Sequence, residues 1–219
     1  MSATQSQHVI QIDIVSDVVC PWCIVGFLHL RGALQQLDVP ARLRWHPFEL
    51  NPDMSSDAQL LSAHIAEKYG ATPEQNRQTR ARLATLGTEL GFTFNFDAHS
   101  RIVNTFLVHQ LLDWAETQGQ QHPFKLAVFD AYFTQQHDVS DIDVLMAVAD
   151  TLNLDTGAAH AALTSGRHAT AVREKQRFWR DLGISGVPSM VFDRKYLLTG
   201  AQGTDTYAHI LQRCLTEAA

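Results

Sequence analysis

Apolar residues follow a strand-like pattern at both ends of the chain and a helical pattern in the middle. Residues 8–15, HVIQIDIV, are dense in β-branched side chains and flanked by polar residues, which predicts a strand buried on both faces of a sheet. Residues 22–37 carry apolar side chains at helical spacing, and residues 41–46, ARLRWH, alternate apolar and polar positions until Pro47 removes a backbone donor. We therefore expect a strand, helix, strand unit in which a right-handed crossover makes the strands parallel.

Between about 55 and 180 the apolar residues recur at three- and four-residue spacing, and Gly, Pro or Asn-Pro residues separate the segments. Thr72 and Asp141 stand where N-terminal caps are expected, and the last segment should break near Ser165–Gly166. This pattern predicts about six helices, with approximate extents 57–69, 74–90, 104–117, 122–134, 141–152 and 155–181.

The strand-like pattern returns near the C-terminus. Ser189–Phe192 and Tyr196–Thr199 flank the turn residues Asp193-Arg194-Lys195, which predicts a hairpin, and a helix should follow at about 204–216. Without its middle, the chain therefore has the order strand, helix, strand, then strand, strand, helix.

Two cysteines, Cys20 and Cys23, lie between the first strand and the first helix, separated by Pro21 and Trp22. A thiol at the first turn of a helix faces unpaired backbone N–H groups and the positive end of the helix dipole, which both favour the thiolate. A thiolate attacks disulfides, and a second thiol one turn away can close on the mixed disulfide. We expect Cys20 to be the nucleophile, because it precedes the helix and should be the more exposed thiol, and Cys23 to resolve the intermediate.

This element order, with a Cys-x-x-Cys motif opening the first helix, is the thioredoxin-like arrangement. The predicted fold class is α/β: a thioredoxin-like core with a large all-helical insertion between its βαβ and ββα halves. Residues 1–54 and 182–219 are expected to form the thioredoxin-like domain, and residues 55–181 the helical insertion domain.

Net charge and the lengths of the apolar runs exclude some classes of function. A net charge of -6 and a pI near 6.0 provide no basic surface, so binding to nucleic acid or to an anionic membrane is not expected. The N-terminus, MSATQSQH, lacks the features of a secretory signal, and no apolar run has the length of a bilayer span, so we expect a cytoplasmic protein. The third cysteine, Cys214, shares a helix face with apolar residues and should be a buried, inert thiol.

A zinc site is the main structural alternative for the cysteine pair. Such a site needs a second Cys-x-x-Cys unit or a pair of histidines. No second cysteine pair exists, and the 11 histidines are scattered, so we expect no metal site. Disulfide exchange by a cysteine pair needs no organic cofactor either, so none is expected.

Five separated motifs carry a family resemblance: SDVVCPWC, RWHPFELNPD, NTFLVHQ, GISGVPSMVF and LTGAQ. Together, from about residue 9 to about residue 213, they resemble the DsbA-like thioredoxin family and specifically its FrnE-like branch. This family is related to 2-hydroxychromene-2-carboxylate isomerases and kappa-class glutathione transferases. The resemblance implies a thioredoxin core with a helical insertion and thiol–disulfide oxidoreductase activity.

The resemblance also implies further site residues. Pro188 should follow a cis peptide bond and face the dithiol, which leaves the backbone of Val187 free to pair with an extended substrate. The segment of Asn104 should border the site, so that Asn104 contacts a thiol ligand, although capping of a helix also explains it. Ser189 stands where many relatives carry an aromatic residue. Trp22 is interpreted either as a surface for the substrate or as a packed aromatic residue.

Three other polar residues have two interpretations each. Asp17 can relay a proton to Cys23 or, more commonly for a loop aspartate, cap a turn. His46 and His109 lie in apolar stretches, where a hydrogen-bonded core histidine is the usual case and a catalytic base is the exception.

Three functions are consistent with these residues. The first is an oxidoreductase that exchanges disulfides with a protein or small-molecule substrate, with glutathione as a candidate co-substrate. The second is a glutathione-dependent isomerase or transferase in which the helical insertion forms a pocket for an aromatic or polyketide-like substrate. The third is a non-enzymic binding module that uses the cysteines as a thiol switch. A monomer and a homodimer are both compatible with the sequence.

Overall fold

The computed structural model describes residues 8–218. Its thioredoxin-like part consists of β1 (Ile10–Ser16), α1 (Pro21–Leu37), β2 (Ala41–Pro47), β5 (Ser189–Phe192), β6 (Tyr196–Thr199) and α9 (Thr204–Ala218). The middle of the chain consists of β3 (Gln59–Leu60), α2 (Leu61–Tyr69), α3 (Pro73–Leu90), β4 (Arg101–Ile102), α4 (Phe106–Thr117), α5 (Gln121–Phe133), α6 (Ile142–Thr151), α7 (Thr156–Thr164) and α8 (Arg167–Asp181).

A four-stranded sheet in the order β2-β1-β5-β6 forms the centre of the molecule. Strands β1 and β2 are parallel, as the crossover argument predicts, and Ile10 pairs with Ala41 at the start of the ladder. Strand β5 runs antiparallel to both β1 and β6. The predicted hairpin is confirmed at its predicted bounds.

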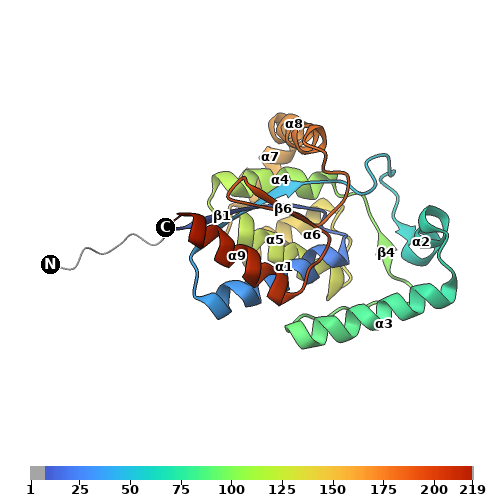
Figure 1. Ribbon diagram of the computed structural model, residues 1–219. Helices are drawn as coiled ribbons and strands as arrows, with labels where there is room; N and C mark the ends of the chain where they lie inside the picture. The colour runs from blue at the N-terminus through green and yellow to red at the C-terminus, as the bar shows by residue number, and fades with distance from the viewer. Residues whose placement is uncertain (1–7, 219) are drawn as a thin grey trace.

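Helices α1 and α9 cover one face of this sheet (Figure 1). Ile10, Ile12 and Ile14 point to that face and are buried with Phe27 of α1 and Tyr207 of α9. Burial of such large apolar side chains contributes roughly 1.5–3 kcal/mol each, so this layer anchors the dithiol helix to the sheet.

The other face of β1 is covered only near the C-terminal end of the strand. Val15 packs with Trp179 of α8 and with Ile184, whereas Gln11 is exposed and Asp13 is half-buried. The prediction of a strand buried on both faces is therefore wrong for the first half of β1, because α8 does not extend over it.

Helix α5 packs against β2, which is an edge strand of the sheet. The side-chain amide of Gln121 accepts from the Trp45 amide and donates to the Trp45 carbonyl, both at 2.9 Å. These bonds replace a neighbouring strand and satisfy backbone groups that an edge would otherwise leave unpaired.

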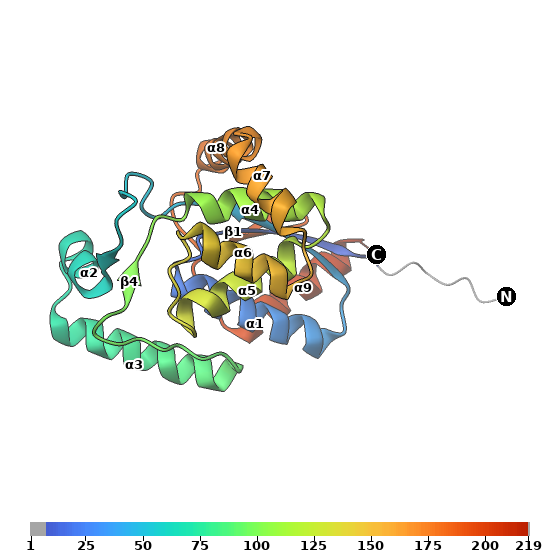
Figure 2. The ribbon, with the colours of Figure 1, turned by 180° about the vertical axis from the view of Figure 1, so that it is seen from behind.

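Helices α2 and α3, with the short ladder of β3 and β4, project to one side of the core (Figures 1 and 2). The predicted helix at 57–69 begins only at Leu61, because residues 59–60 pair with residues 101–102 instead. The two short strands were not predicted.

Other predicted boundaries agree closely with the structure. Thr72 forms a capping box with Gln75, and the Asp141 side chain accepts from the amide of Asp143. The predicted break at Ser165–Gly166 is confirmed, since Gly166 has a φ of 71° between α7 and α8. Within residues 8–218, no helix combines the length and the apolar character that crossing a membrane requires.

Candidate active site

The dithiol lies at the junction of β1 and α1. Cys20 is the N-cap residue of α1, and Pro21 takes a first-turn position where its missing N–H is not needed. The Cys23 amide donates to the Cys20 carbonyl at 3.0 Å. Both side chains are free thiols, with Cys20 4% exposed and Cys23 0% exposed. Cys20 is thus the more accessible thiol, although only a small part of it reaches the surface.

A loop from the C-terminal half of the chain faces Cys20. The Val187–Pro188 peptide bond is cis, and Cys20 Sγ lies 3.8 Å from the Val187 carbonyl oxygen in a long S–H···O contact. The Gly200 amide donates to the Pro188 carbonyl at 2.7 Å. Ser189 is buried, and its hydroxyl donates to a carbonyl within the same loop at 2.8 Å. The structure therefore brings Cys20, Val187 and Pro188 together, with Ser189 turned into the loop.

Asp17 is a buried carboxylate in the turn before α1. Its Oδ1 accepts from the Val18 amide at 2.8 Å, and its Oδ2 accepts from the Leu50 amide at 2.7 Å. His109 Nε2 lies 3.3 Å from Oδ1 and 3.1 Å from the Phe48 carbonyl oxygen. Because a carbonyl only accepts, Nε2 of His109 carries a proton and donates.

The charge of Asp17 follows from these contacts. Burial acts to raise the pKa of Asp17, but the hydrogen bond and charge of His109, the Leu50 amide and the charge of Lys125 together hold that pKa below 3.8. Asp17 is therefore an anion at neutral pH. A proton relay works best with a pKa near the working pH, so the structure favours the turn-capping interpretation of Asp17.

Lys125 is the residue of this site that sequence reasoning missed. It lies in α5 and is only 1% exposed, with its ammonium over the rings of Trp45 and Phe129 at 5.3 and 4.8 Å from their centroids. Burial lowers the pKa of Lys125 from 10.5 to about 8, while Cys23 and Asp17 act to raise it. A signal existed in the sequence, since this lysine interrupts the buried, mostly apolar face of its helix.

A cavity of about 430 Å³ lies beside Cys20. Its lining includes Trp22 at the dithiol end of α1, Val187 of the facing loop, and residues of the projecting helices α2 and α3. Its volume falls in the range of small-molecule sites. The guanidinium of Arg82 lies 5.5 Å from the centroid of the Trp22 ring. Other residues of the lining include Leu50, Asn51, His64, Ile65, Tyr69, Asn76, Arg80, Leu83, Phe96, Tyr132 and Phe133.

Asn104, the remaining predicted site residue, makes structural contacts with both ends of its amide. Its Nδ2 donates to the Met54 carbonyl at 2.8 Å, and its Oδ1 accepts from the amide of Phe106, the first residue of α4, at 2.9 Å. It is not among the residues that line the cavity beside Cys20. A contact between Asn104 and a thiol ligand stays a prediction.

Both histidines singled out in the sequence are buried and hydrogen-bonded, as expected. His46 Nε2 lies 2.7 Å from Asp13 Oδ1, and the ring packs on Trp179 at 4.7 Å between centroids. His109 contacts the Asp17 carboxylate instead. Among residues 8–218, no group of three His, Cys, Asp or Glu side chains is placed to hold a metal ion.

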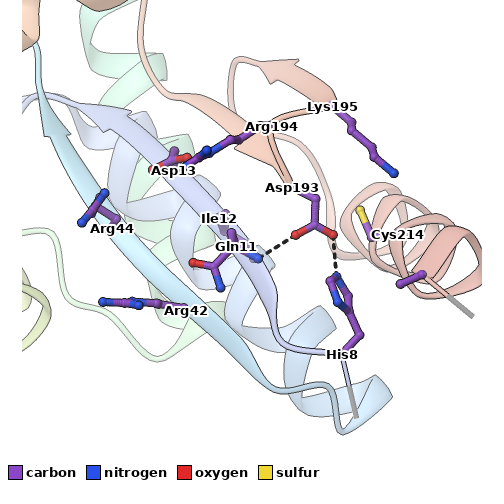
Figure 3. Close-up of a pocket in the computed structure, with 11 residues that line it drawn as sticks. His8, Gln11, Ile12, Asp13, Arg42, Arg44, Asp193, Arg194, Lys195 and Cys214 are labelled. Atoms are coloured by element: carbon purple, nitrogen blue, oxygen red, sulfur yellow. Dashed lines mark hydrogen bonds and ion pairs between the residues drawn. The ribbon is translucent and has the colours of Figure 1, made fainter. Parts of the chain in front are cut away.

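A second cavity, of about 560 Å³, lies at the opposite end of the sheet (Figure 3). The Asp193 carboxylate accepts from the Gln11 amide at 2.8 Å and lies 2.8 Å from His8 Nε2. Cys214 on α9 lies in its wall and is buried, as predicted, and burial raises the pKa of its thiol. Asp193 lies beside the first residues of β1, whereas Cys20 follows the last residue of β1. The two sites are therefore at opposite ends of this strand, and the second cavity is separate from the dithiol site.

Comparison with known proteins places this geometry in a family. The model of the DSBA-like thioredoxin domain matches residues 11–212. A probable DsbA oxidoreductase from Streptomyces coelicolor is 28% identical, with a TM-score of 0.89 over 95% of this chain and 91% of that one. A 2-hydroxychromene-2-carboxylate isomerase is 18% identical, with a TM-score of 0.71 over 95% of this chain and 98% of that one.

The cytosolic disulfide reductase DsbM from Pseudomonas aeruginosa, in a structure with GSH, is also similar. It is 18% identical, with a TM-score of 0.65 over 94% of this chain and 99% of that one. At this level of identity, DsbM and the isomerase show a shared fold and nothing more specific. The family match covers nearly the whole chain, and the chain belongs to the DSBA-like thioredoxin domain family.

Proposed function

We propose that this protein is a thiol–disulfide oxidoreductase in which Cys20 is the nucleophile and Cys23 the resolving thiol. The observation that carries the proposal is the position of Cys20: it stands at the N-cap position of α1, lines the cavity and faces the Val187 carbonyl at 3.8 Å. Cys23 lies one turn further on and is fully buried. A substrate therefore meets Cys20 first.

The reaction needs no further oxidant. The Cys20 thiolate attacks one sulfur of a substrate disulfide, and the other substrate sulfur leaves as a thiolate. The Cys23 sulfur then attacks Cys20, releases the second substrate thiol and leaves a disulfide between Cys20 and Cys23. In the opposite direction the protein disulfide oxidises a dithiol. Electron flow follows the difference in reduction potential between the protein and its partner.

The substrate is proposed to be a disulfide or thiol that reaches Cys20 through the cavity, with Trp22 and Val187–Pro188 as its contact surface. A volume of about 430 Å³ suits a low-molecular-weight compound, and glutathione is a candidate co-substrate. DsbM, whose structure was determined with GSH, offers a precedent within the same fold. No metal or organic cofactor takes part in the proposed exchange, and the reducing cytoplasm is its proposed setting.

Cysteine variants test this proposal. Reduced wild-type protein should reduce glutathione disulfide or insulin, Cys20→Ser should lose this activity, and Cys23→Ser should trap a mixed disulfide on Cys20 that mass spectrometry detects. Cys214→Ser is the matched control, because it removes a thiol that lies away from the dithiol, and should keep the wild-type rate. Full turnover by Cys20→Ser would overturn the assignment.

A glutathione-dependent isomerase is the second candidate, and the cavity beside Cys20 favours it. Tyr69 of α2, and Tyr132 and Phe133 of α5, contribute aromatic rings to the lining, and α3 contributes mainly polar side chains such as Arg80. Aromatic walls with a few polar groups suit an aromatic small molecule. Isomerisation needs one thiol at most, so Cys23→Ser should keep isomerase turnover with an aromatic substrate and glutathione. Loss of all turnover in Cys23→Ser, with trapping of the mixed disulfide, would favour exchange.

A further inference from the structure

The cavity beside Cys20 carries positive charge without an opposing carboxylate. Arg80 of the projecting helix α3 lines it, and no aspartate or glutamate occurs among the described residues of the lining (Figure 1). Burial lowers the pKa of His64, the other basic residue of the lining, so Arg80 supplies the permanent charge. A second guanidinium, that of Arg82, lies 5.5 Å from the centroid of the Trp22 ring, which also lines the cavity. A ligand that reaches Cys20 therefore lies next to cations.

Neutral groups hold Arg80 in place. Its Nε donates to Asn76 Oδ1 at 3.1 Å, and its Nη1 donates to the Asp97 carbonyl at 2.7 Å. Its guanidinium carbon lies 6.0 Å from the centroid of the Phe96 ring. Arg80 forms no ion pair within residues 8–218, whereas Arg77, one turn earlier on α3, contacts the Glu74 carboxylate. The Arg80 side chain is thus fixed while its charge stays unbalanced.

Two donor groups at this end of the cavity have no acceptor. The Nη2 group of Arg80 has no hydrogen-bond partner in the described part of the chain. Asn76 is buried and lines the cavity, and its Oδ1 is occupied by Arg80, while its Nδ2 has no acceptor among the same residues. Both groups only donate, and a carboxylate only accepts. Together they match a carboxylate, which a guanidinium and a second N–H donor bind through charge-assisted hydrogen bonds.

Acidic side chains of this region line a neighbouring cavity instead. That cavity has a volume of about 650 Å³, and Asp53, Asp57 and Glu67 line it together with Lys68. The Lys68 ammonium donates to a backbone carbonyl at 2.6 Å. The neighbouring cavity therefore contains charges of both signs, and the cavity beside Cys20 is the one whose lining favours an anion.

We propose that Arg80 is a specificity-determining residue of the dithiol site, and that the substrate is a low-molecular-weight disulfide with a carboxylate on an apolar or aromatic body. This inference rests on the proposed oxidoreductase function and deepens it, because it names the class of substrate. The carboxylate accepts from Arg80 Nη2 and Asn76 Nδ2, and the body of the substrate lies against the aromatic rings of the lining. The substrate disulfide then faces Cys20, and the exchange proceeds as described above.

The test compares two disulfides of nearly equal size, para-dithiodibenzoic acid and its neutral diamide. Each is mixed with reduced wild-type protein, and each rate is divided by the rate at which β-mercaptoethanol reduces the same disulfide, which removes the difference in intrinsic reactivity. The corrected kcat/KM should be about tenfold or more higher for the acid, which is the range for hydrogen bonds to a charged group. The net charge of the protein, -6, acts against this preference, so a general attraction of anions does not explain it.

Substitution of Arg80 tests the assignment of the residue. Arg80→Gln should remove most of the preference through a higher KM for the acid, and should change the rate with the diamide less than about threefold. Arg80→Lys keeps the charge and should keep part of the preference. Arg77→Gln is the matched control, because it removes the same charge from an exposed position of α3 outside the lining, and should keep the wild-type preference. An equal fall in the rates with both disulfides in Arg80→Gln would show a structural role and overturn the assignment.

The wild-type protein alone remains decisive if Arg80→Gln does not fold. Equal corrected rates with the acid and the diamide would overturn the substrate class and leave the proposed function standing. The same holds if neither aromatic disulfide reacts while glutathione disulfide does. Absence of exchange with all three disulfides would instead overturn the proposed function, so the two failures are distinguishable.

Discussion

Replacing Asp17 with Asn should destabilise the fold and do so in a pH-dependent way. The carboxylate accepts from the Val18 and Leu50 amides at 2.8 and 2.7 Å and contacts His109 Nε2 at 3.3 Å. An Asn side chain can keep its oxygen toward Val18 and His109, but its NH₂ group then faces the Leu50 N–H, donor against donor. Leaving that amide without an acceptor costs about 1–2 kcal/mol.

The second part of the cost is electrostatic. Asp17→Asn removes the carboxylate that stabilises the buried Lys125 ammonium, which adds about 1 kcal/mol at the effective dielectric of a protein interior. The free energy of unfolding at pH 7 should therefore fall by about 2–3 kcal/mol in total. Urea denaturation followed by tryptophan fluorescence measures this value.

The pH dependence has a defined sign. The folded-state pKa of Asp17 is lowered, so its stabilising contribution is present above the unfolded value near 3.8 and is lost as the pH falls through the folded value. The difference between wild type and Asp17→Asn should thus be largest between about pH 5 and 7 and shrink in more acidic solution. Asp150→Asn, on an exposed position of α6, should change stability by less than about 0.5 kcal/mol. A difference between wild type and Asp17→Asn that is absent at pH 7, or that grows in acid, would refute this reasoning.

Two further substitutions test the placement of the site. Gly26→Ala adds a methyl group that would lie 3.2 Å from the Tyr207 hydroxyl and 3.4 Å from Pro188 Cγ. Alanine favours a helix over glycine by about 1 kcal/mol, but crowding of the new methyl group against Tyr207 and Pro188 should offset that gain, so the Tm should change little. The rate of disulfide exchange should fall severalfold. A higher Tm with an unchanged exchange rate would contradict this prediction. Gln121→Leu should lower the free energy of unfolding by about 2 kcal/mol, because it leaves the amide and carbonyl of Trp45 unpaired. A variant as stable in urea as wild type would show that Gln121 does not stabilise the edge strand β2.

Local signals were sufficient for much of the fold. The hairpin has turn residues between two short apolar runs, and both its strands have their predicted bounds. Gly166 has a positive φ and separates α7 from α8 at the predicted break. In such places the backbone conformation depends on neighbouring residues, so the sequence pattern is informative.

Features that depend on distant partners were not predictable in this way. Residues 59–60 continue a helical pattern in the sequence, but their pairing with residues 101–102 places them in a strand. Gln11 lies in an apolar run and is exposed, because whether α8 extends over that end of β1 is a tertiary property. Local propensity is a weak prior that such contacts override.

The residues of the candidate site show the same difference between local sequence signals and distant contacts. Cys20, Cys23 and Pro188 were identified from motifs, and the structure brings Cys20 to the Val187–Pro188 loop. Lys125 comes from a helix about a hundred residues away from the dithiol in sequence, and only its low exposure and ring contacts reveal its place. A charged residue on an apolar helix face can be noticed in the sequence as a candidate buried charge, but the groups that it contacts become known only from the fold.

The central claim is that Cys20 and Cys23 form a redox pair, and its most direct test is equilibration of the wild-type protein in glutathione redox buffers. Alkylation of the remaining thiols and mass spectrometry then locate the disulfide at each ratio. We predict a single reversible disulfide between Cys20 and Cys23, with Cys214 free throughout, and a reduction potential within roughly -270 to -120 mV, the range of dithiols of this type. Failure to form that disulfide at any ratio, or a disulfide that involves Cys214 instead, would contradict the claim.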